Sequence, residues 1–214
     1  MNRREELATN LATIKSEIPA HVKLIVVTKT FPASDVEILK DLGVEDFGEN
    51  RDQEGSIKAD KVSATWHFQG QLQSNKLKSI CSWANVIHSL DSLRYVDLIS
   101  KAALKPLSLF IQVSLEPAEG RGGANPNSLT EIADAVLAAE KLELLGLMAV
   151  APLGIEPNQA FAKLAEIHHR FRTSYPDSPY LSAGMSGDYK AAIAHGATHI
   201  RIGSSILGSR PPIR

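Results

Sequence analysis

The sequence predicts an α/β protein, a single (β/α)8 barrel of the TIM type that spans residues 1–214 as one domain. Short β-like runs alternate with helical segments along the whole chain. Several of these runs, KLIVVT, LSLFIQVSL and LELLGLMAV, are almost continuously apolar, as parallel strands covered on both faces are. Eight strands in about 200 residues match the lower size limit of this barrel. An open doubly wound sheet is the alternative.

The expected elements follow one another in strand–helix order. The strands are Lys23–Thr28, Glu45–Gly48, Thr65–Gly70, Val86–Leu90, Leu107–Leu115, Leu142–Val150, Tyr180–Ala183 and His199–Gly203. The helices between them begin or end at recognisable signals. These signals are capping-box pairs at Ser34 with Glu37 and at Ser128 with Glu131, an N-cap at Asp91, a first-turn proline at Pro157 and a terminating glycine at Gly196. The longest expected loop is Glu116–Asn127, which is rich in Gly and Pro.

Composition excludes several classes of protein. The net charge is −1 and no run of five like charges occurs, which argues against a nucleic-acid or acidic-membrane partner. The one cysteine, Cys81, cannot form an internal disulfide, and the charged N-terminus has no apolar segment of a secretory signal. The longest apolar stretch is too short to span a bilayer. We therefore expect a cytoplasmic protein.

Polar and glycine residues gather directly after the expected strands rather than before them. In a barrel these ends share one face, the face on which barrel enzymes build their sites. Their occurrence after five strands is stronger evidence than any single motif. The segments are Thr28-Lys29-Thr30, Gly48-Glu49-Asn50, His67-Phe68-Gln69-Gly70, Gly184-Met185-Ser186-Gly187 and Gly203-Ser204-Ser205.

Lys29 ends an apolar strand, and two interpretations of it stay open. Its stem could line the barrel rim while its ammonium reaches water. Alternatively, desolvation disfavours the ammonium form, and the neutral amine can then attack an aldehyde.

The two glycine-serine turns, at 184–187 and 203–205, are either simple tight turns or a phosphate site. Exposed backbone N–H groups before helices favour an anion, and the loops after strands seven and eight are the usual phosphate site of this fold. We predict phosphate binding from the pair. No metal site is predicted, because His195 and His199 flank the helix break at Gly196 and His168 and His169 cannot share one helix face.

Arg201 lies inside the last strand between Ile200 and Ile202, so its side chain points either into the barrel or toward the helices. A buried guanidinium needs an acceptor. The acceptor is either a protein carboxylate or an atom of a ligand.

Taken together, these segments resemble the pyridoxal phosphate homeostasis protein family, which is related in fold to the N-terminal barrel of bacterial alanine racemases. The matching stretches run in order along nearly the whole chain and are specific as a set. They are VVTKTFP (26–32), FGENRDQE (47–54), WHFQGQLQSNKLK (66–78), GLMAVAP (146–152) and LSAGMSGDYKAAIAHGATHIRIGSSILGSR (181–210). The loop at 116–123 departs from the family, in which a lysine is more usual near Arg121, and receives no role.

The resemblance implies a bound pyridoxal 5'-phosphate (PLP) and assigns residues to it. Lys29 would carry the cofactor as a Schiff base, and Arg201 would face the pyridine nitrogen. The remaining residues implied by the resemblance are Ser186, Gly203 and Ser204 at the phosphate and Asn50, His67 and Met148 around the ring.

The reaction stays open between three hypotheses. Arginine only donates, so a pyridine nitrogen bonded to Arg201 is unprotonated and the ring is a weaker electron sink. A racemase also needs a second acid/base group, which in alanine racemases comes from an additional domain. The first hypothesis is therefore a PLP carrier or buffer, monomeric, with apo PLP-dependent enzymes as recipients. The others are a low-activity amino-acid racemase and a PLP-independent barrel enzyme acting on a phosphorylated metabolite.

Overall fold

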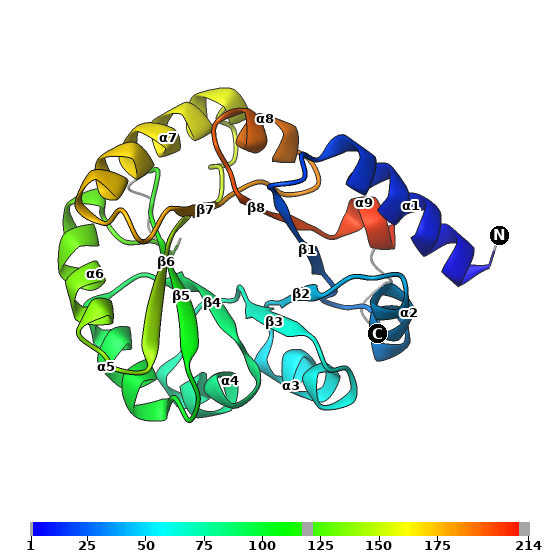
Figure 1. Cartoon of the computed structure of the whole chain (residues 1–214), viewed down its shortest axis with the longest axis horizontal. Coiled ribbons are helices and arrows are strands. Elements are labelled where there is room, and N and C mark those ends of the chain that lie inside the picture. The colour runs from blue at the N-terminus through cyan, green and yellow to red at the C-terminus, as the bar shows by residue number, and fades with distance from the viewer. Residues whose placement is uncertain (1, 117–121, 210–214) are drawn as a thin grey trace.

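Eight parallel strands pair in chain order and close on themselves in the computed structural model, which describes residues 2–116 and 122–209 (Figure 1). The closure is made by pairing of the first strand with the last, Lys23 opposite His199 and Val26 opposite Ile202. The open-sheet alternative is therefore wrong, and the barrel prediction is confirmed. The strands are β1 (Lys23–Val27), β2 (Asp46–Glu49), β3 (Thr65–Phe68), β4 (Val86–Leu90), β5 (Leu107–Gln112), β6 (Leu142–Met148), β7 (Tyr180–Ser182) and β8 (His199–Ile202).

All eight expected strands are present, and the largest difference lies at the end of β5. That strand ends at Gln112 instead of Leu115. Beyond it, Val113 pairs only in an isolated bridge with Ala124, because the chain turns into the following loop. Apolar composition continues past the strand because Val113 and Leu115 are buried in the core without being in the sheet. Residues 117–121 of the expected loop lie outside the described part of the chain.

The helices surround the barrel and cover its outer surface (Figure 1). They are α1 (Arg3–Glu17), α2 (Ala33–Asp41), α3 (Asp52–Lys61), α4 (Leu77–Trp83), α5 (Leu93–Ala102), α6 (Leu129–Leu137), α7 (Pro157–Ser174), α8 (Tyr189–Ala194) and α9 (Ser204–Leu207), with short 3-10 turns at Ser74–Lys76 and Pro126–Ser128. None of the helices in the described ranges is both long and apolar enough to cross a membrane.

Some of the helix starts and ends predicted from the sequence are observed in the structure, and others are not. Pro157 occupies the first turn of α7, and Gly196 follows α8 with a φ of +91°, as expected. The capping box at Ser34 is wrong, since α2 starts one residue earlier, after Pro32, and has no side-chain cap. Ser128 does precede α6 but makes no cap hydrogen bond. Asp91 is not a cap either; Ser92 occupies that position before α5, again without a side-chain cap bond.

The apolar core lies mainly between the strands and the helices, whereas the barrel interior holds many polar side chains. Ile200 and Ile202 of β8 belong to the large cluster that packs the helices onto the sheet. A separate small cluster joins Val86, Phe110 and Met148 from β4, β5 and β6. Because side chains alternate along a strand, Arg201 points away from its two isoleucine neighbours, toward the barrel interior.

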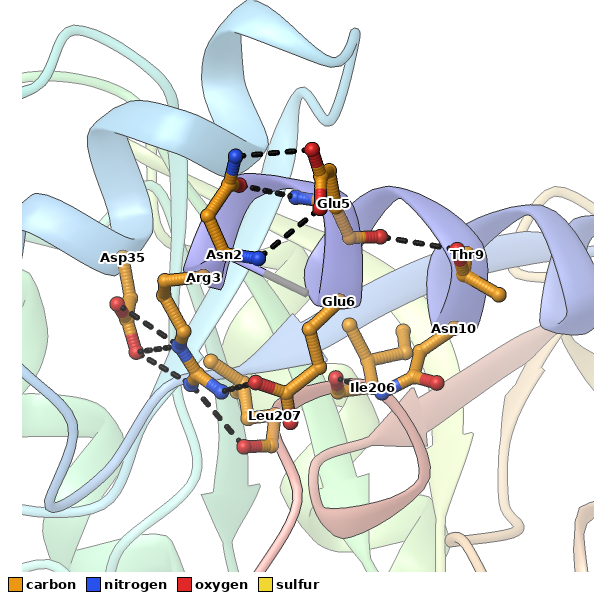
Figure 2. Close-up of polar contacts among 9 residues, drawn as sticks. All are labelled: Asn2, Arg3, Glu5, Glu6, Thr9, Asn10, Asp35, Ile206 and Leu207. Atoms are coloured by element: carbon orange, nitrogen blue, oxygen red, sulfur yellow. Dashed lines mark hydrogen bonds and ion pairs between the residues drawn. The ribbon is translucent and has the colours of Figure 1, made fainter.

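The first helix ties the last helix to the barrel, as Figure 2 shows. Arg3 donates to both carboxylate oxygens of Asp35 on α2, at distances from 2.6 to 3.2 Å, and to the backbone oxygen of Leu207, at 3.0 Å. Asn10 donates to the backbone oxygen of Ile206, at 2.9 Å. These contacts satisfy the carbonyl end of α9. The amino end of α9 follows β8 directly through Gly203, where the second glycine-serine turn lies.

Candidate functional site

The two glycine-serine turns predicted from the sequence meet at the carboxyl ends of β7 and β8. The hydroxyl oxygen of Ser186 accepts hydrogen bonds from the backbone N–H groups of Gly203, at 3.2 Å, and Ser205, at 3.3 Å. Two backbone N–H groups that converge on one oxygen form a concave donor site suited to an anion. Gly184 makes the turn possible, because it has a φ of +93° and a Cβ there would lie 2.8 Å from the Tyr189 backbone.

Lys29 lies next to this donor site, two residues beyond the end of β1. A Cβ atom on Gly203 would lie 3.2 Å from the backbone oxygen of Val27, so the two chain segments pass close together. Lys29 itself is half-buried. The carboxyl ends of the first and last strands therefore lie side by side, as expected for a closed barrel.

Arg201 is buried in the barrel interior and is 4% exposed. Its guanidinium donates to the hydroxyl of Ser182, at 2.7 Å, and to the backbone oxygen of Ala149, at 3.0 Å. Both acceptors are neutral, and none of the ion pairs within the described ranges includes Arg201. Burial lowers the pKa of Arg201 to about 10. The sequence left open whether the acceptor of Arg201 is a protein carboxylate or a ligand atom. Among the described residues no carboxylate accepts from its guanidinium.

A chain of hydrogen bonds runs from Arg201 across the interior to Asp46 at the start of β2. Ser182 lies 2.9 Å from His88 Nδ1, His88 Nε2 lies 2.8 Å from His67 Nδ1, and His67 Nε2 lies 3.0 Å from Asp46. Burial lowers the pKa of both His67 and His88, so the two rings are neutral at pH 7. Arg201 can only donate hydrogen bonds and the ionised Asp46 can only accept them. Each hydrogen bond of the chain is therefore donated in the direction from Arg201 toward Asp46.

The three residues that the resemblance assigns to the ring lie in different surroundings. Met148 is buried against Val86 and Phe110, and His67 is buried with both ring nitrogens hydrogen bonded. Asn50 is exposed after β2 and lines a surface cavity. Ser186 lines a different cavity with Ser205 and Lys190. The structure thus brings Ser186 together with the backbone of Gly203 and Ser205, whereas Asn50 is not part of that group.

Sequence reasoning missed several polar residues of the interior and of the surroundings of Lys29. His88 and Ser182 each interrupt or end an apolar strand, and this interruption was the signal that could have identified them. The missed residues are His88, Ser182 and Lys58, the last on a helix that otherwise reads as solvent-exposed; Glu49 was noted after the second strand but received no role. Cys81 is free and buried, and burial raises the pKa of its thiol to about 11, which makes it a poor nucleophile.

Comparison with known families agrees with this geometry. The family model described as "Alanine racemase, N-terminal domain" matches residues 3–211. The fold alone is shared with an alanine racemase of Clostridium difficile, with a TM-score of 0.78 at 18% identity over 97% of this chain and 57% of that one. The chain therefore belongs to the class of proteins built on the alanine racemase N-terminal barrel.

Sequence relatives define the family more narrowly. The pyridoxal phosphate homeostasis protein of Mycobacterium leprae is 38% identical over 97% of this chain and 94% of its own length. That of Escherichia coli K12 is 35% identical over 96% and 97%. Within that class the chain belongs to the pyridoxal phosphate homeostasis protein family. The structure of PipY from Synechococcus elongatus with PLP bound has a TM-score of 0.87 at 32% identity, over 94% of this chain and all of PipY.

Proposed function

We propose that this protein binds PLP as a Schiff base on Lys29 and acts in PLP homeostasis as a carrier or buffer of the cofactor rather than as an efficient catalyst. The observation that carries the proposal is the convergence of the Ser186 hydroxyl with the N–H groups of Gly203 and Ser205 beside the end of β1. A phosphate fits such a donor set, because its oxygens accept hydrogen bonds from backbone N–H groups and hydroxyls. The solved PLP complex of a 32% identical protein supports the same assignment.

The residues present suit the rest of the cofactor. Lys29 supplies an amine at the barrel mouth, and Arg201 supplies a buried donor whose protein acceptors are neutral. Ser204, the first residue of α9, would hold the phosphate with Ser186 and Gly203. The positions of Asn50, His67 and Met148 around the ring stay predictions. When bound, PLP supplies an aldehyde that can be held and released by the lysine.

The four tyrosines of the chain support the carrier function over racemisation, because a racemase needs a second acid/base group opposite the lysine. The hydroxyl of Tyr95 donates to the backbone oxygen of Leu72, and that of Tyr175 to Asp134. Tyr189 donates to Glu17. Tyr180 opens β7, at the opposite end of the strand from Ser182 and the glycine-serine turns. Three of the four hydroxyls are thus already bound to other groups of the protein, and the fourth tyrosine lies at the amino end of its strand.

We further propose that apo PLP-dependent enzymes receive the cofactor, that the protein acts as a monomer and that it resides in the cytoplasm. Transfer to recipients follows from the carrier role, since a Schiff base on a lysine exchanges reversibly with other amines.

The test is the absorption spectrum of the purified protein, followed by borohydride reduction and peptide mass spectrometry. We expect a yellow Schiff-base band and a phosphopyridoxyl label on Lys29. The Lys29→Ala variant should lose both, while Lys190→Ala, an exposed lysine at the Ser186 cavity, should keep both. A label found chiefly on Lys190 or Lys76 would refute the assignment. Brisk racemisation of L-alanine by the wild type, seen by chiral analysis, would refute the carrier function.

A further inference from the structure

The peptide groups on both sides of Lys29 are held by side chains from another part of the barrel. Lys58 of α3 donates to the backbone oxygen of Thr28, at 2.8 Å. Glu54, also on α3, accepts the backbone N–H of Thr30, at 2.7 Å. The segment that carries Lys29 is thus fixed immediately before and immediately after that residue.

A buried ion pair supports this arrangement. Lys58 lies 2.5 Å from Glu49, which ends β2, and the two side chains are 5% and 0% exposed. The hydroxyl of Thr28 donates to the same carboxylate oxygen, at 2.5 Å. Burial raises the pKa of Glu49, although Lys58 and Thr28 oppose that shift. Because a buried pair of charges is costly to desolvate, the pair adds little net stability, but it fixes the position of the groups that it contacts.

The backbone directly after Lys29 has a strained conformation, and the contacts from α3 lie at this point of the chain. Thr30 has a φ of +70°, and it is the one non-glycine residue with positive φ in the described ranges. A β-branched side chain rarely adopts this conformation. Strain of this kind persists only where the surroundings impose it, and it concentrates at functional sites. The hydrogen bond from the Thr30 N–H to the Glu54 carboxylate is a contact that favours this conformation.

We propose that Glu49, Glu54 and Lys58 are positioning residues for Lys29, and we refer to these three side chains as the lysine clamp. The clamp fixes the backbone on both sides of the lysine and so directs its Cα–Cβ bond toward the barrel mouth. None of the three need touch the cofactor. This inference rests on the proposed function, since it assumes that the amine of Lys29 reacts with PLP.

Binding measurements with two ligands distinguish a clamp that positions Lys29 from residues that only stabilise the fold. PLP has the aldehyde that reacts with a lysine, whereas pyridoxine 5'-phosphate keeps the ring and the phosphate but has an alcohol in its place. A loosened clamp should therefore weaken PLP binding and leave pyridoxine 5'-phosphate binding unchanged. A general loss of structure should weaken both ligands together.

Glu54→Leu is the principal variant, because Glu54 is at the surface end of the clamp, with 26% of its side chain exposed. If the freed segment holds Lys29 in the reactive geometry about one-tenth of the time, PLP affinity should fall about tenfold. Glu54→Gln keeps an acceptor oxygen and should restore affinity to near the wild-type value. Asp60→Leu, an exposed acidic residue on the same helix, is the matched control and should change neither affinity.

A second variant keeps the test decisive if Glu54→Leu is unstable. The double replacement of Lys58 by Met and Glu49 by Leu removes both buried charges together and should also weaken PLP alone. Equal weakening of the two ligands, or unchanged PLP affinity in folded Glu54→Leu and in the double variant, would overturn the clamp. If instead wild type and Lys29→Ala bound PLP equally well, the proposed function itself would fail, and that outcome is separate.

Discussion

Replacement of Arg201 by methionine tests whether this arginine serves the fold or a ligand. The side chain is buried, and its two protein acceptors are the Ser182 hydroxyl and the Ala149 backbone oxygen. Methionine is unbranched and flexible, so it fills the space of the arginine stem without a charge.

The structure sets the expected change in the stability of the cofactor-free protein. Burial lowers the pKa of Arg201 to about 10, which corresponds to roughly 3 kcal/mol of unfavourable charge burial that the variant would remove. Against this, Ser182 and Ala149 each lose a donor, at about 1–3 kcal/mol for an acceptor left unsatisfied. The two acceptor losses add to about 2–6 kcal/mol, so we expect a net change between about 1 kcal/mol of stabilisation and about 3 kcal/mol of destabilisation. A structural arginine in a buried ion pair would instead cost about 3–5 kcal/mol.

Urea denaturation of the cofactor-free proteins measures the free energy of unfolding, and titration with PLP measures affinity. Arg201→Met should keep most of its stability and lose roughly tenfold or more in PLP affinity, the value of a hydrogen bond from a charged donor. Arg94→Met, at an exposed position on α5, is the control and should change neither quantity. A stability loss above about 3 kcal/mol with unchanged PLP affinity would show that Arg201 is structural and does not meet the ring.

Three further predictions follow from other contacts. Ser186→Ala should lower PLP affinity roughly tenfold without affecting pyridoxal, which lacks the phosphate; equal losses by spectral titration would contradict it. Acidification from pH 7 to pH 5 should lower the free energy of unfolding by about 2 kcal/mol for each of His168 and His199. Burial lowers their pKa values to about 4 and about 3, so the unfolded chain binds more protons below pH ~6.5 and stability falls with pH; flat urea midpoints would refute this. Lys58→Met should destabilise by about 3–5 kcal/mol, because it leaves the Glu49 charge unpaired, and adding Glu49→Leu should recover most of that loss in the same assay.

The fold could be predicted because its signals are local. Parallel strands covered on both faces are apolar throughout, so KLIVVT and LELLGLMAV identify β1 and β6 without knowledge of their neighbours. Local apolar composition does not indicate that the sheet closes into a barrel, because the closing pair, Lys23 and His199, joins residues far apart in sequence. The capping predictions at Ser34 and Asp91 failed because α2 starts after Pro32 and α5 after Ser92, and neither helix has a side-chain cap.

The site could be predicted only in part, and the limit is again physical. The turns at 184–187 and 203–205 were identifiable from glycine and serine composition, and the structure joins them through Ser186. The direction of Arg201 was not, because a strand buried on both faces gives no alternation from which to choose. The contacts of Lys58 required the folded structure, since in sequence it reads as one more lysine on a polar helix.

The donor chain behind Arg201 favours a carrier over a catalyst. Its hydrogen bonds run in one direction, from the guanidinium through Ser182, His88 and His67 to Asp46. Burial lowers the pKa of both histidines far below that of Arg201, so neither ring takes a proton from the guanidinium. Arg201 therefore remains a donor, and a pyridine nitrogen that it contacts remains unprotonated. An unprotonated ring withdraws electrons weakly, so amino-acid chemistry at the cofactor is disfavoured while capture of the aldehyde by Lys29 is not. Under the proposed function, the same buried guanidinium would let the protein hold a reactive aldehyde without efficient amino-acid chemistry.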